Sequence, residues 1–421
     1  MRVRIEKLAP TGEGIVRTAD GVGFVDGALP GELVETSIYE RRRRFWRGSL
    51  RGVLEPSRDR VATAHAGCAG CDWAHFAPAA AREAKTALFL ETMQRIGRLS
   101  PASFGAPEPA PSEAGYRLRT RLHVAGRGAA ARVGYHAPGS HRVVSAAACE
   151  AISDSTRASL EPIASAIGEG GLDAAEIAIL ENIPGARRLL RITAAAGPAE
   201  EAALADAARR LESRFDGVRL RPPRGPVRLE RGVERLGLEV GGRRFEVSVD
   251  AFFQGNRHLV GRLSADVADE AGRAAPGEAL DAFGGVGLFA GALLSAGHRV
   301  TSVEADTEAA AGARATRERW PDRERWTVEE SSVAEFLRGT DRRFDVVLAD
   351  PPRAGLGTAL AGELARRARR LLLYVSCDPA TLARDLPAMR AEGLEIRSTR
   401  LYDLFAFTHR VESLVALERE A

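Results

Sequence analysis

The sequence lacks several features that would assign it to a specialised class. No apolar run approaches the roughly 20 residues that a membrane-spanning helix needs, and no apolar stretch follows the charged residues of the N-terminus. We therefore expect a cytoplasmic protein with no membrane partner and no signal peptide. Only four of the 421 residues are cysteine. In a cytosolic chain, four cysteines favour metal binding or catalysis over a set of disulfides.

Lysine is nearly absent, since Lys7 and Lys85 are the only two, although lysine and arginine together number 60. A GC-rich genome explains this preference more simply than function does. The formal net charge of +3 identifies no partner, but arginine suits phosphate and stacks on bases wherever it gathers locally. The composition, 45% hydrophobic and 28% charged, is that of a globular protein, and the length suffices for two or three domains.

Residues 1–60 have the pattern of a small all-β module, because short alternating runs are separated by glycine turns. A basic run, Arg41–Arg44, precedes Phe45, Trp46 and Arg47. One interpretation is a solvated basic strand and loop. The other is a phosphate-tracking surface on which the aromatic side chains are available for stacking, as in an RNA-binding β-barrel.

Residues 61–250 are expected to form a central α+β domain. A loop at 61–76 carries Cys68 and Cys71, apolar residues at helical spacing predict a helix over 79–96, and a stretch near 100–112 rich in proline and alanine predicts a linker. Alternation over 116–124 predicts a strand whose arginines at 117, 119 and 121 share one face. That face is exposed either to solvent or to RNA.

Residues 251–421 alternate between strand and helix patterns. Apolar runs at 279–283, 300–304, 346–350 and 371–375 predict strands, and alanine-rich, charged stretches between them predict helices. This alternation is typical of a doubly wound α/β sheet.

A glycine-rich turn follows the first of these strands, with Gly285 and Gly287 in the segment 281–290. Glycines at a strand-to-helix turn let the backbone approach a ligand, and Glu304, which ends the next strand, is suited to accept ribose hydroxyls. The same turn satisfies the dinucleotide fingerprint, so an NAD-dependent oxidoreductase is a rival hypothesis at this point.

Three further side chains follow later strands of the same predicted sheet. Asp350 begins Asp-Pro-Pro-Arg, Cys377 stands before a predicted helix near Pro379, and Glu412 begins a late apolar strand. Because residues just past the carboxyl ends of such strands face the ligand crevice, these groups are expected to meet. We expect the helix start to stabilise a Cys377 thiolate, and burial to raise the pKa of Glu412 so that it acts as a general base.

In this order the motifs resemble the RNA uracil-5 methyltransferase family, which modifies tRNA and 23S rRNA. The segment Phe252-Phe253-Gln254-x-Asn256 resembles the family's stretch before the cofactor loop, and residues 1–60 resemble a TRAM domain. The resemblance implies a Rossmann-like class I methyltransferase domain at 251–421. It also implies an S-adenosyl-L-methionine site and makes Cys377 the nucleophile and Glu412 the base. The implied cofactor-binding residues are Gln254, Phe283, Gly285, Gly287, Glu304 and Asp350.

The expected reaction is formation of 5-methyluridine in structured RNA, with 23S rRNA favoured over tRNA. Thiolate attack on C6 makes C5 electron-rich enough to accept a methyl group, and a base then removes the C5 proton. The uridine must leave its stack, and Phe253 or Phe405 is a candidate to fill the gap. We expect a monomer. A non-catalytic RNA-binding protein of the same fold is a third hypothesis.

The sequence departs from the family pattern at several positions. Asp378 stands where the family often has asparagine, and Leu288 where some members have it. Many members hold a 4Fe-4S cluster with four cysteines. Here Cys68, Cys71 and Cys149 match three of them, and Ala62 stands in place of the first. Two alternatives stay open: a cluster held by three cysteines and an outside ligand, or a loop that has lost its metal.

Overall fold

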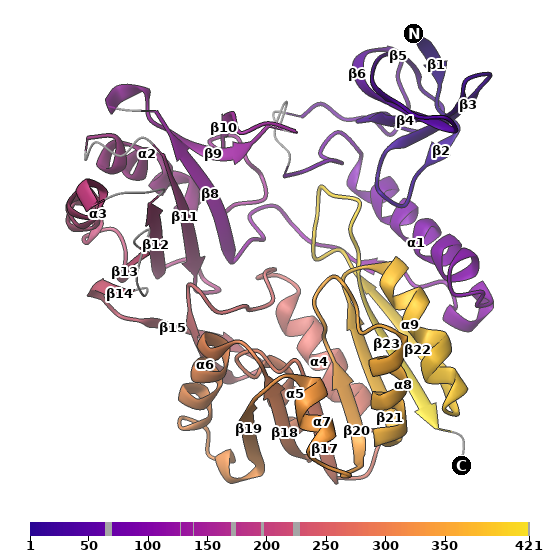
Figure 1. The fold of residues 1–421 in the computed structure, drawn as a ribbon, viewed down its shortest axis with the longest axis vertical. Helices are drawn as coiled ribbons and strands as arrows, with labels where there is room; N and C mark the ends of the chain where they lie inside the picture. The colour runs from indigo at the N-terminus through magenta and orange to yellow at the C-terminus, as the bar shows by residue number, and fades with distance from the viewer. Residues whose placement is uncertain are drawn as a thin grey trace.

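The computed structural model describes residues 1–63, 70–126, 128–137, 139–169, 174–194, 198–221 and 228–419. These residues form three groups of elements, each built on its own large sheet (Figure 1). A β-barrel holds the N-terminus, a second sheet carries two helices, and the third sheet lies between helices on both faces. No helix in these described ranges is both long enough and apolar enough to cross a membrane.

The N-terminal strands close into a barrel. Their sheet order is β1-β5-β6-β4-β3-β2, and β1 and β2 are successive pieces of one N-terminal segment. That segment pairs with β5 at its start and with β3 at its end, so the two edges of the sheet meet. The strands are β1 (Arg2–Arg4), β2 (Lys7–Leu8), β3 (Gly14–Thr18), β4 (Gly21–Asp26), β5 (Leu33–Arg41) and β6 (Phe45–Glu55).

The barrel interior corrects the interpretation that both aromatics of the basic run are available for stacking. Trp46 is 0% exposed and packs in the barrel core, because alternation along β6 turns it inward. Phe45 is half-buried, with its ring edge-on to Phe24 at 6.1 Å. Arg41–Arg44 are exposed, so the run presents guanidinium groups and only part of one ring.

The second sheet has seven strands in the order β10-β9-β8-β11-β12-β13-β14. Two helices, α2 and α3, cover one of its faces and share an apolar core with it; they lie at the outer left of Figure 1. The elements are β8 (Arg119–Ala125), β9 (Arg132–His136), β10 (Val143–Ser145), α2 (Asp154–Glu169), β11 (Ala174–Glu181), β12 (Arg188–Ala194), α3 (Pro198–Leu211), β13 (Gly217–Arg221) and β14 (Arg228–Gly232).

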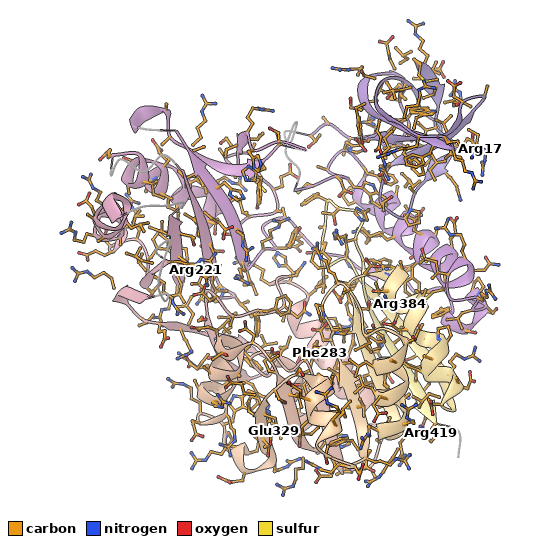
Figure 2. The ribbon with its side chains drawn as sticks, in the orientation of Figure 1. Arg17, Arg221, Phe283, Glu329, Arg384 and Arg419 are labelled. Carbon is orange, nitrogen blue, oxygen red and sulfur yellow. The ribbon has the colours of Figure 1, made fainter. Side chains whose placement is uncertain are left out.

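Arginines occupy the face of this sheet opposite α2 and α3, part of which packs against the core of the third sheet. The pairing register aligns Arg121, Ala178, Arg191 and Arg219 in one row across four strands. Arg191 and Arg219 form ion pairs with Asp250, and their side chains are 5% exposed. Arg121 is 58% exposed and, like Arg221 in Figure 2 at 47% exposed, remains accessible.

The third sheet has the order β19-β18-β17-β20-β21-β23-β22-β7. Strands β17 to β21 run parallel, and β23 is antiparallel to both its neighbours. Strands predicted at 279–283, 300–304, 346–350 and 371–375 are present. The strands are β15 (Arg235–Val240) and β16 (Arg243–Ser248), which form a separate hairpin, and β17 (Glu278–Ala282), β18 (Arg299–Glu304), β19 (Trp326–Glu330), β20 (Phe344–Ala349), β21 (Ala368–Ser376), β22 (Leu394–Tyr402) and β23 (Glu412–Arg419).

Helices cover both faces of this sheet, as a doubly wound α/β fold requires. One apolar core joins the sheet to α4, α5, α6 and the β15–β16 hairpin, and another joins it to α1, α7, α8 and α9. The helix predicted over 79–96 is present as α1. The helices are α1 (Pro78–Arg95), α4 (Val260–Ala271), α5 (Leu288–Ser295), α6 (Thr307–Arg317), α7 (Val333–Arg338), α8 (Thr358–Arg367) and α9 (Pro379–Ala391).

The segment expected as a linker near 100–112 takes part in the catalytic sheet. It forms a 3-10 turn at Pro101–Phe104, and then β7 (Pro109–Ala110) pairs in parallel with β22. Helix α1 and the β15–β16 hairpin also pack on the third sheet's layers, although both lie between 61 and 250. The division at 1–60, 61–250 and 251–421 stays a prediction about domains.

Candidate active site

Four of the predicted site residues follow strands of the third sheet at one edge. Phe283, Glu304, Asp350 and Cys377 lie at or just past the ends of β17, β18, β20 and β21, which are parallel neighbours. Their carboxyl ends therefore meet, as expected for the ligand crevice of an open α/β sheet. Figure 2 shows Phe283 at this edge, near the middle of the molecule.

The glycine turn has the backbone of a ligand-binding loop. Phe283 adopts φ +67°, and Gly285 adopts φ +54°; the first is a strained conformation for an aromatic residue. The Gly285 N–H donates to Glu304 Oε2 at 2.8 Å, and the Asp306 N–H donates to Glu304 Oε1 at 2.7 Å. The Glu304 carboxylate is thus held against the turn while it remains partly exposed.

The two predicted cofactor glycines differ in the space around the position where a side chain would begin. A Cβ on Gly285 would meet nothing closer than 3.9 Å, from the Phe252 carbonyl, so its surface is open to a ligand. A Cβ on Gly287 would lie 2.2 Å from the Trp326 ring. Because that ring packs so close, no larger residue fits at position 287, and packing alone explains why it is glycine.

Two carboxyl groups lie behind this turn. Asp281 is 0% exposed; its Oδ2 accepts from Ser302 Oγ at 3.1 Å, and its Oδ1 has no hydrogen-bond partner. Burial raises its pKa to about 7. Asp350 Oδ2 accepts from Gln254 Nε2 at 2.9 Å. Burial, opposed by that hydrogen bond and reinforced by Asp281, raises the pKa of Asp350 to about 7. Gln254 and Asp350, which lie far apart in sequence, are therefore direct partners.

Cys377 and Glu412 are brought together by the register of β21 and β23. The last paired residues of these antiparallel strands are Ser376 and Ser413, and Cys377 and Glu412 are the next residue on each. Glu412 is 1% exposed, and its Oε1 has no hydrogen-bond partner. Burial, with the nearby charge of Asp350, raises its pKa well above the usual value, as the sequence analysis expected for a general base.

The expectation that a helix start stabilises the Cys377 thiolate is wrong for this arrangement. Burial and the charges of Glu412 and Asp350 raise the pKa of Cys377 to about 12. The N-terminus of α9 offers little help, because the Asp378 side chain already accepts from the N–H groups of Ala380 at 2.8 Å and Thr381 at 3.2 Å. A capped and negatively charged helix start does not favour a second anion.

Arg353 is a site residue that the sequence analysis did not single out. Its positive charge lowers the pKa of both Cys377 and Glu412, so it is the cation that opposes the surrounding carboxylates. The signal was present in the sequence, since Arg353 ends the motif that begins with Asp350. The sequence-based prediction used the carboxylate of this motif, Asp350, and not its cation, Arg353.

The aromatic residues suggested as gap fillers are arranged differently from the prediction. Phe253 is 4% exposed and packs against Phe245 with ring centroids 5.8 Å apart, so it belongs to the core. Phe405 is half-buried. The adjacent Phe252 is 58% exposed, beside the open face of Gly285. One ring of the pair is therefore packed in the core, and the other is exposed at this edge.

The predicted metal ligands are only partly described. Cys68 lies outside the described residues. Cys71 and Cys149 are both buried and in contact, and a hydrogen bond from Cys71, with N–H groups of Ala151 and Ile152, lowers the pKa of Cys149 to about 5. Ala62 is exposed. With Cys377 at the sheet edge, at most three cysteines remain, which does not fit a cluster held by four cysteines of this chain. Across the described parts of the chain, no group of three or more His, Cys, Asp or Glu is arranged to hold a metal.

Comparison with known proteins agrees with this geometry. Residues 327–420 match the family model described as tRNA (Uracil-5-)-methyltransferase. An uncharacterized RNA methyltransferase of Streptomyces avermitilis is 32% identical over 100% of this chain and 98% of its own length. The 23S rRNA (uracil(1939)-C(5))-methyltransferase RlmD of Dechloromonas aromatica is 31% identical, with 99% of each chain covered. The RlmD of Halomonas elongata is 30% identical over 98% of this chain and 88% of its own.

Among solved structures, the Pyrococcus abyssi tRNA (uracil-54, C5)-methyltransferase, in complex with S-adenosyl-L-homocysteine, matches 99% of both chains with a TM-score of 0.78 and 22% identity. The fold and the sheet edge define a class I methyltransferase with an N-terminal β-barrel. The chain belongs to the RNA uracil-5 methyltransferase family. The relatives named above are methyltransferases, which favours the first of the three hypotheses raised by the sequence.

Proposed function

We propose that this enzyme uses S-adenosyl-L-methionine to methylate C5 of a uridine in 23S rRNA. One observation carries the proposal: the β21–β23 register sets Cys377 opposite Glu412 at the edge where Asp350 and the glycine turn also lie. A nucleophile, a buried base and a nucleotide-binding turn at one edge are the groups that uracil C5 methylation requires.

The glycine turn and its neighbours fit an adenosyl ligand. The surface of Gly285 is open, Glu304 offers a partly exposed carboxylate to ribose hydroxyls, and the Gln254–Asp350 pair offers polar atoms beside it. Phe283 lies at the same edge. When bound, S-adenosyl-L-methionine supplies the methyl group and a positively charged sulfur. We propose that Gln254, Phe283, Gly285, Glu304 and Asp350 hold it, with Gly287 shaping the turn.

Cys377 begins the reaction as a thiolate. Its Sγ forms a bond to C6 of the uracil, and the electrons of the C5=C6 bond move toward C5 and the C4 carbonyl oxygen. C5 is then nucleophilic enough to accept a methyl group. Attack requires loss of the thiol proton. Arg353 favours that loss, and the proton passes to solvent, to which Cys377 is partly exposed.

Glu412 enters the last step as a carboxylate and leaves it protonated. It removes the C5 proton, the electrons of the C5–H bond re-form C5=C6, and the C6–S bond breaks to return the Cys377 thiolate. The full burial of Glu412 and its partnerless Oε1 support this role, because a free carboxylate oxygen remains available for a proton. No step of this sequence uses an iron–sulfur cluster.

Arginines support a structured RNA as the substrate. Arg41–Arg44 are exposed on the barrel, and Arg121 and Arg221, 58% and 47% exposed, lie on the central sheet at the face opposite α2 and α3. Guanidinium groups on two separate sheets suit contacts with a folded RNA backbone. The two RlmD relatives, which cover nearly the whole chain, favour 23S rRNA over tRNA. We propose a monomer that acts in the cytoplasm.

Substitution of the nucleophile tests the proposal. Cys377→Ala should lower methyl transfer to unmodified 23S rRNA transcripts at least about a thousandfold, with no covalent protein–RNA species on denaturing gels. Cys149→Ala is the matched control, since that cysteine lies in another core. Methylation in Cys377→Ala at the wild-type rate would remove Cys377 from the mechanism. Wild-type protein that methylates tRNA transcripts but not 23S rRNA transcripts would contradict the assigned substrate.

A further inference from the structure

The segment that precedes Glu412 is held by hydrogen bonds from residues distant in the sequence. It connects β22 to β23 and spans residues 403–411, which lie outside both strands. Its backbone includes Phe407 at φ +67°, a left-handed conformation that an aromatic residue adopts only when its surroundings impose it. Residues 404, 406, 408 and 411 are buried. The conformation in which the chain enters Glu412 is therefore set by what this segment touches.

Successive carbonyl groups of this segment accept hydrogen bonds from different parts of the chain. Leu404 O accepts from Asn256 Nδ2 at 2.9 Å. Phe405 O accepts from Lys85 Nζ on α1 at 3.3 Å. Ala406 O accepts from Tyr116 OH at 3.2 Å, and Phe407 O accepts from the Trp73 N–H at 2.9 Å.

Closer to Glu412, the side chains of His409 and Asp72 form a pair. His409, three residues before Glu412, has its Nδ1 2.5 Å from Asp72 Oδ2, and its N–H donates to Asp72 Oδ1 at 3.3 Å. Asp72 thus holds both the backbone and the ring of His409. Asp72 is next to Trp73 in the loop that also carries Cys71.

The β-barrel touches this same pair. Trp73 Nε1 donates to Gly12 O at 2.8 Å, in the turn between β2 and β3. A Cβ on Gly12 would lie 2.7 Å from Asp72 Oδ2 and 3.0 Å from His409 Cβ. The barrel backbone, the Asp72 carboxylate and the His409 ring are therefore packed so closely that none can shift without moving another.

We infer that Asp72 and His409 are a positioning pair that holds the carboxylate of Glu412 in place, with the β-barrel seated on the pair through Gly12. The strand ladder fixes the backbone of Glu412 through its own pairing with Tyr402 of β22, and on its C-terminal side through Ser413 and Ser376. On its N-terminal side, residues 403–411 are held by the Asp72–His409 pair and by the hydrogen bonds to the carbonyl groups of residues 404–407, not by strand pairing. The inference rests on the proposed function, because it gives the pair a task only if Glu412 acts as the base.

The lifetime of the covalent RNA adduct reports on the step that Glu412 performs. If the base is displaced, attack by Cys377 and methyl transfer continue but proton removal slows, so the covalent RNA adduct persists. Asp72→Ala and His409→Ala should lengthen the adduct lifetime on unmodified 23S rRNA transcripts by about tenfold to a hundredfold. Binding of S-adenosyl-L-homocysteine, measured by calorimetry, should stay unchanged. His409→Asn should recover most of the rate, because its amide Nδ2 can stand where the ring Nδ1 donates.

A substitution in the barrel, far from Asp72 and His409 in the sequence, tests the same contact. Gly12→Ala should lengthen the adduct lifetime as the pair variants do. Gly31→Ala is its matched control, since Gly31 also lies in the barrel with φ +82° and its Cβ would meet nothing within 4 Å. Gly31→Ala should keep the wild-type adduct lifetime.

The outcomes are separable. A wild-type adduct lifetime in both Asp72→Ala and His409→Ala would overturn the positioning role, and so would loss of S-adenosyl-L-homocysteine binding in these variants, since that marks a general structural defect. Transcripts containing 5-fluorouridine, in which C5 has no proton to remove, should form adduct equally fast with wild type and variants. Failure of wild-type protein to form 5-methyluridine would reject the proposed function itself, independently of any variant.

Discussion

Two groups of carboxylates on the third sheet differ in their partners. The active-edge group consists of Asp281 and Glu412, which are buried, and Asp350, which is partly exposed. The α4–β22 group consists of Asp266 and Glu270, which lie on α4 and accept hydrogen bonds from side chains of β22. Asp281 and Glu412 are 0% and 1% exposed, and Asp266 and Glu270 are 3% and 1% exposed. Burial is therefore nearly the same, and the difference between the groups must lie in what surrounds them.

The α4–β22 group is paired with cations and hydroxyls. Asp266 Oδ2 accepts from Tyr402 OH and from Arg262 Nε, both at 2.8 Å, and its Oδ1 accepts from Arg400. Glu270 Oε1 accepts from Ser398 Oγ at 3.0 Å and from Arg400 Nη2 at 3.1 Å. Such a network pairs both carboxylates with a cation and joins α4 to β22.

The active-edge group has neutral donors instead. Its hydrogen bonds come from Ser302 and Gln254, while Asp281 Oδ1 and Glu412 Oε1 have no partner. In the α4–β22 group, Glu270 Oε2 also lacks a hydrogen bond, but it forms an ion pair with Arg273 Nε at 3.2 Å. The pKa of each of the three active-edge carboxyls is raised, first by burial. Leaving buried polar atoms without partners costs stability, so this group is explained by proton transfer and ligand binding rather than by folding.

The largest expected effect concerns the partnerless base. Glu412→Gln should lower product formation by about a hundredfold to ten-thousandfold and trap a covalent RNA adduct, because C6 attack and methyl transfer precede the proton removal that fails. The adduct is measured on denaturing gels with labelled transcripts. Unfolding should change little, since no hydrogen bond to Oε1 is lost. Rapid turnover in Glu412→Gln would assign the base to another residue.

Removing a cation from the paired group should give the opposite phenotype. Arg400→Met leaves Asp266 and Glu270 buried with fewer donors, and breaking a buried ion pair costs about 3 kcal/mol, lessened here because the Arg400 side chain is 29% exposed. Thermal unfolding should shift to lower temperature while methyl transfer by the folded enzyme persists. Arg390→Met is the control, since its ion pair with Glu395 is 40% and 48% exposed. An equal shift in both variants would mean that burial does not distinguish the pairs.

The smallest effect is on thiol reactivity. With a pKa raised to about 12, Cys377 is a neutral thiol at pH 7, so its alkylation by iodoacetamide should rise about tenfold per pH unit between pH 7 and 9. Glu412→Gln removes the largest charge that raises this pKa, so alkylation should be faster in that variant at each pH. Peptide mass spectrometry distinguishes Cys377 from the other cysteines. Reactivity that is high and flat with pH would contradict the raised pKa.

Local sequence pattern predicted most of the elements, because helical and strand periodicity survive in the sequence wherever one face is buried. The helix expected over 79–96 is α1, and the four strands expected in the C-terminal half are present. The expected linker was a different case: Pro109–Ala110 is too short to show a period, and it became β7 only because β22 presents an open edge.

The structure brings predicted site residues to one edge of the sheet, but the protonation of Cys377 differs from the expectation. Asp350 and Cys377 reach the expected edge because parallel neighbouring strands end together. The protonation of Cys377 was misjudged, since the sequence does not reveal that Asp378 caps α9 and that Glu412 lies opposite. Trp46 and Phe253 were misjudged for a related reason: a ring's direction depends on which face of its strand or loop the rest of the chain covers.

The amino-acid sequence by itself determined the order of strands and helices and the chemical groups that follow each strand, because periodicity and turn residues act over a few neighbouring positions. Only the tertiary structure decided which buried carboxylates find a cation. It also decided that a loop carrying Asp72 and a barrel turn at Gly12 meet three residues before Glu412. Burial and charge pairing depend on segments hundreds of residues apart, and no local pattern encodes their meeting.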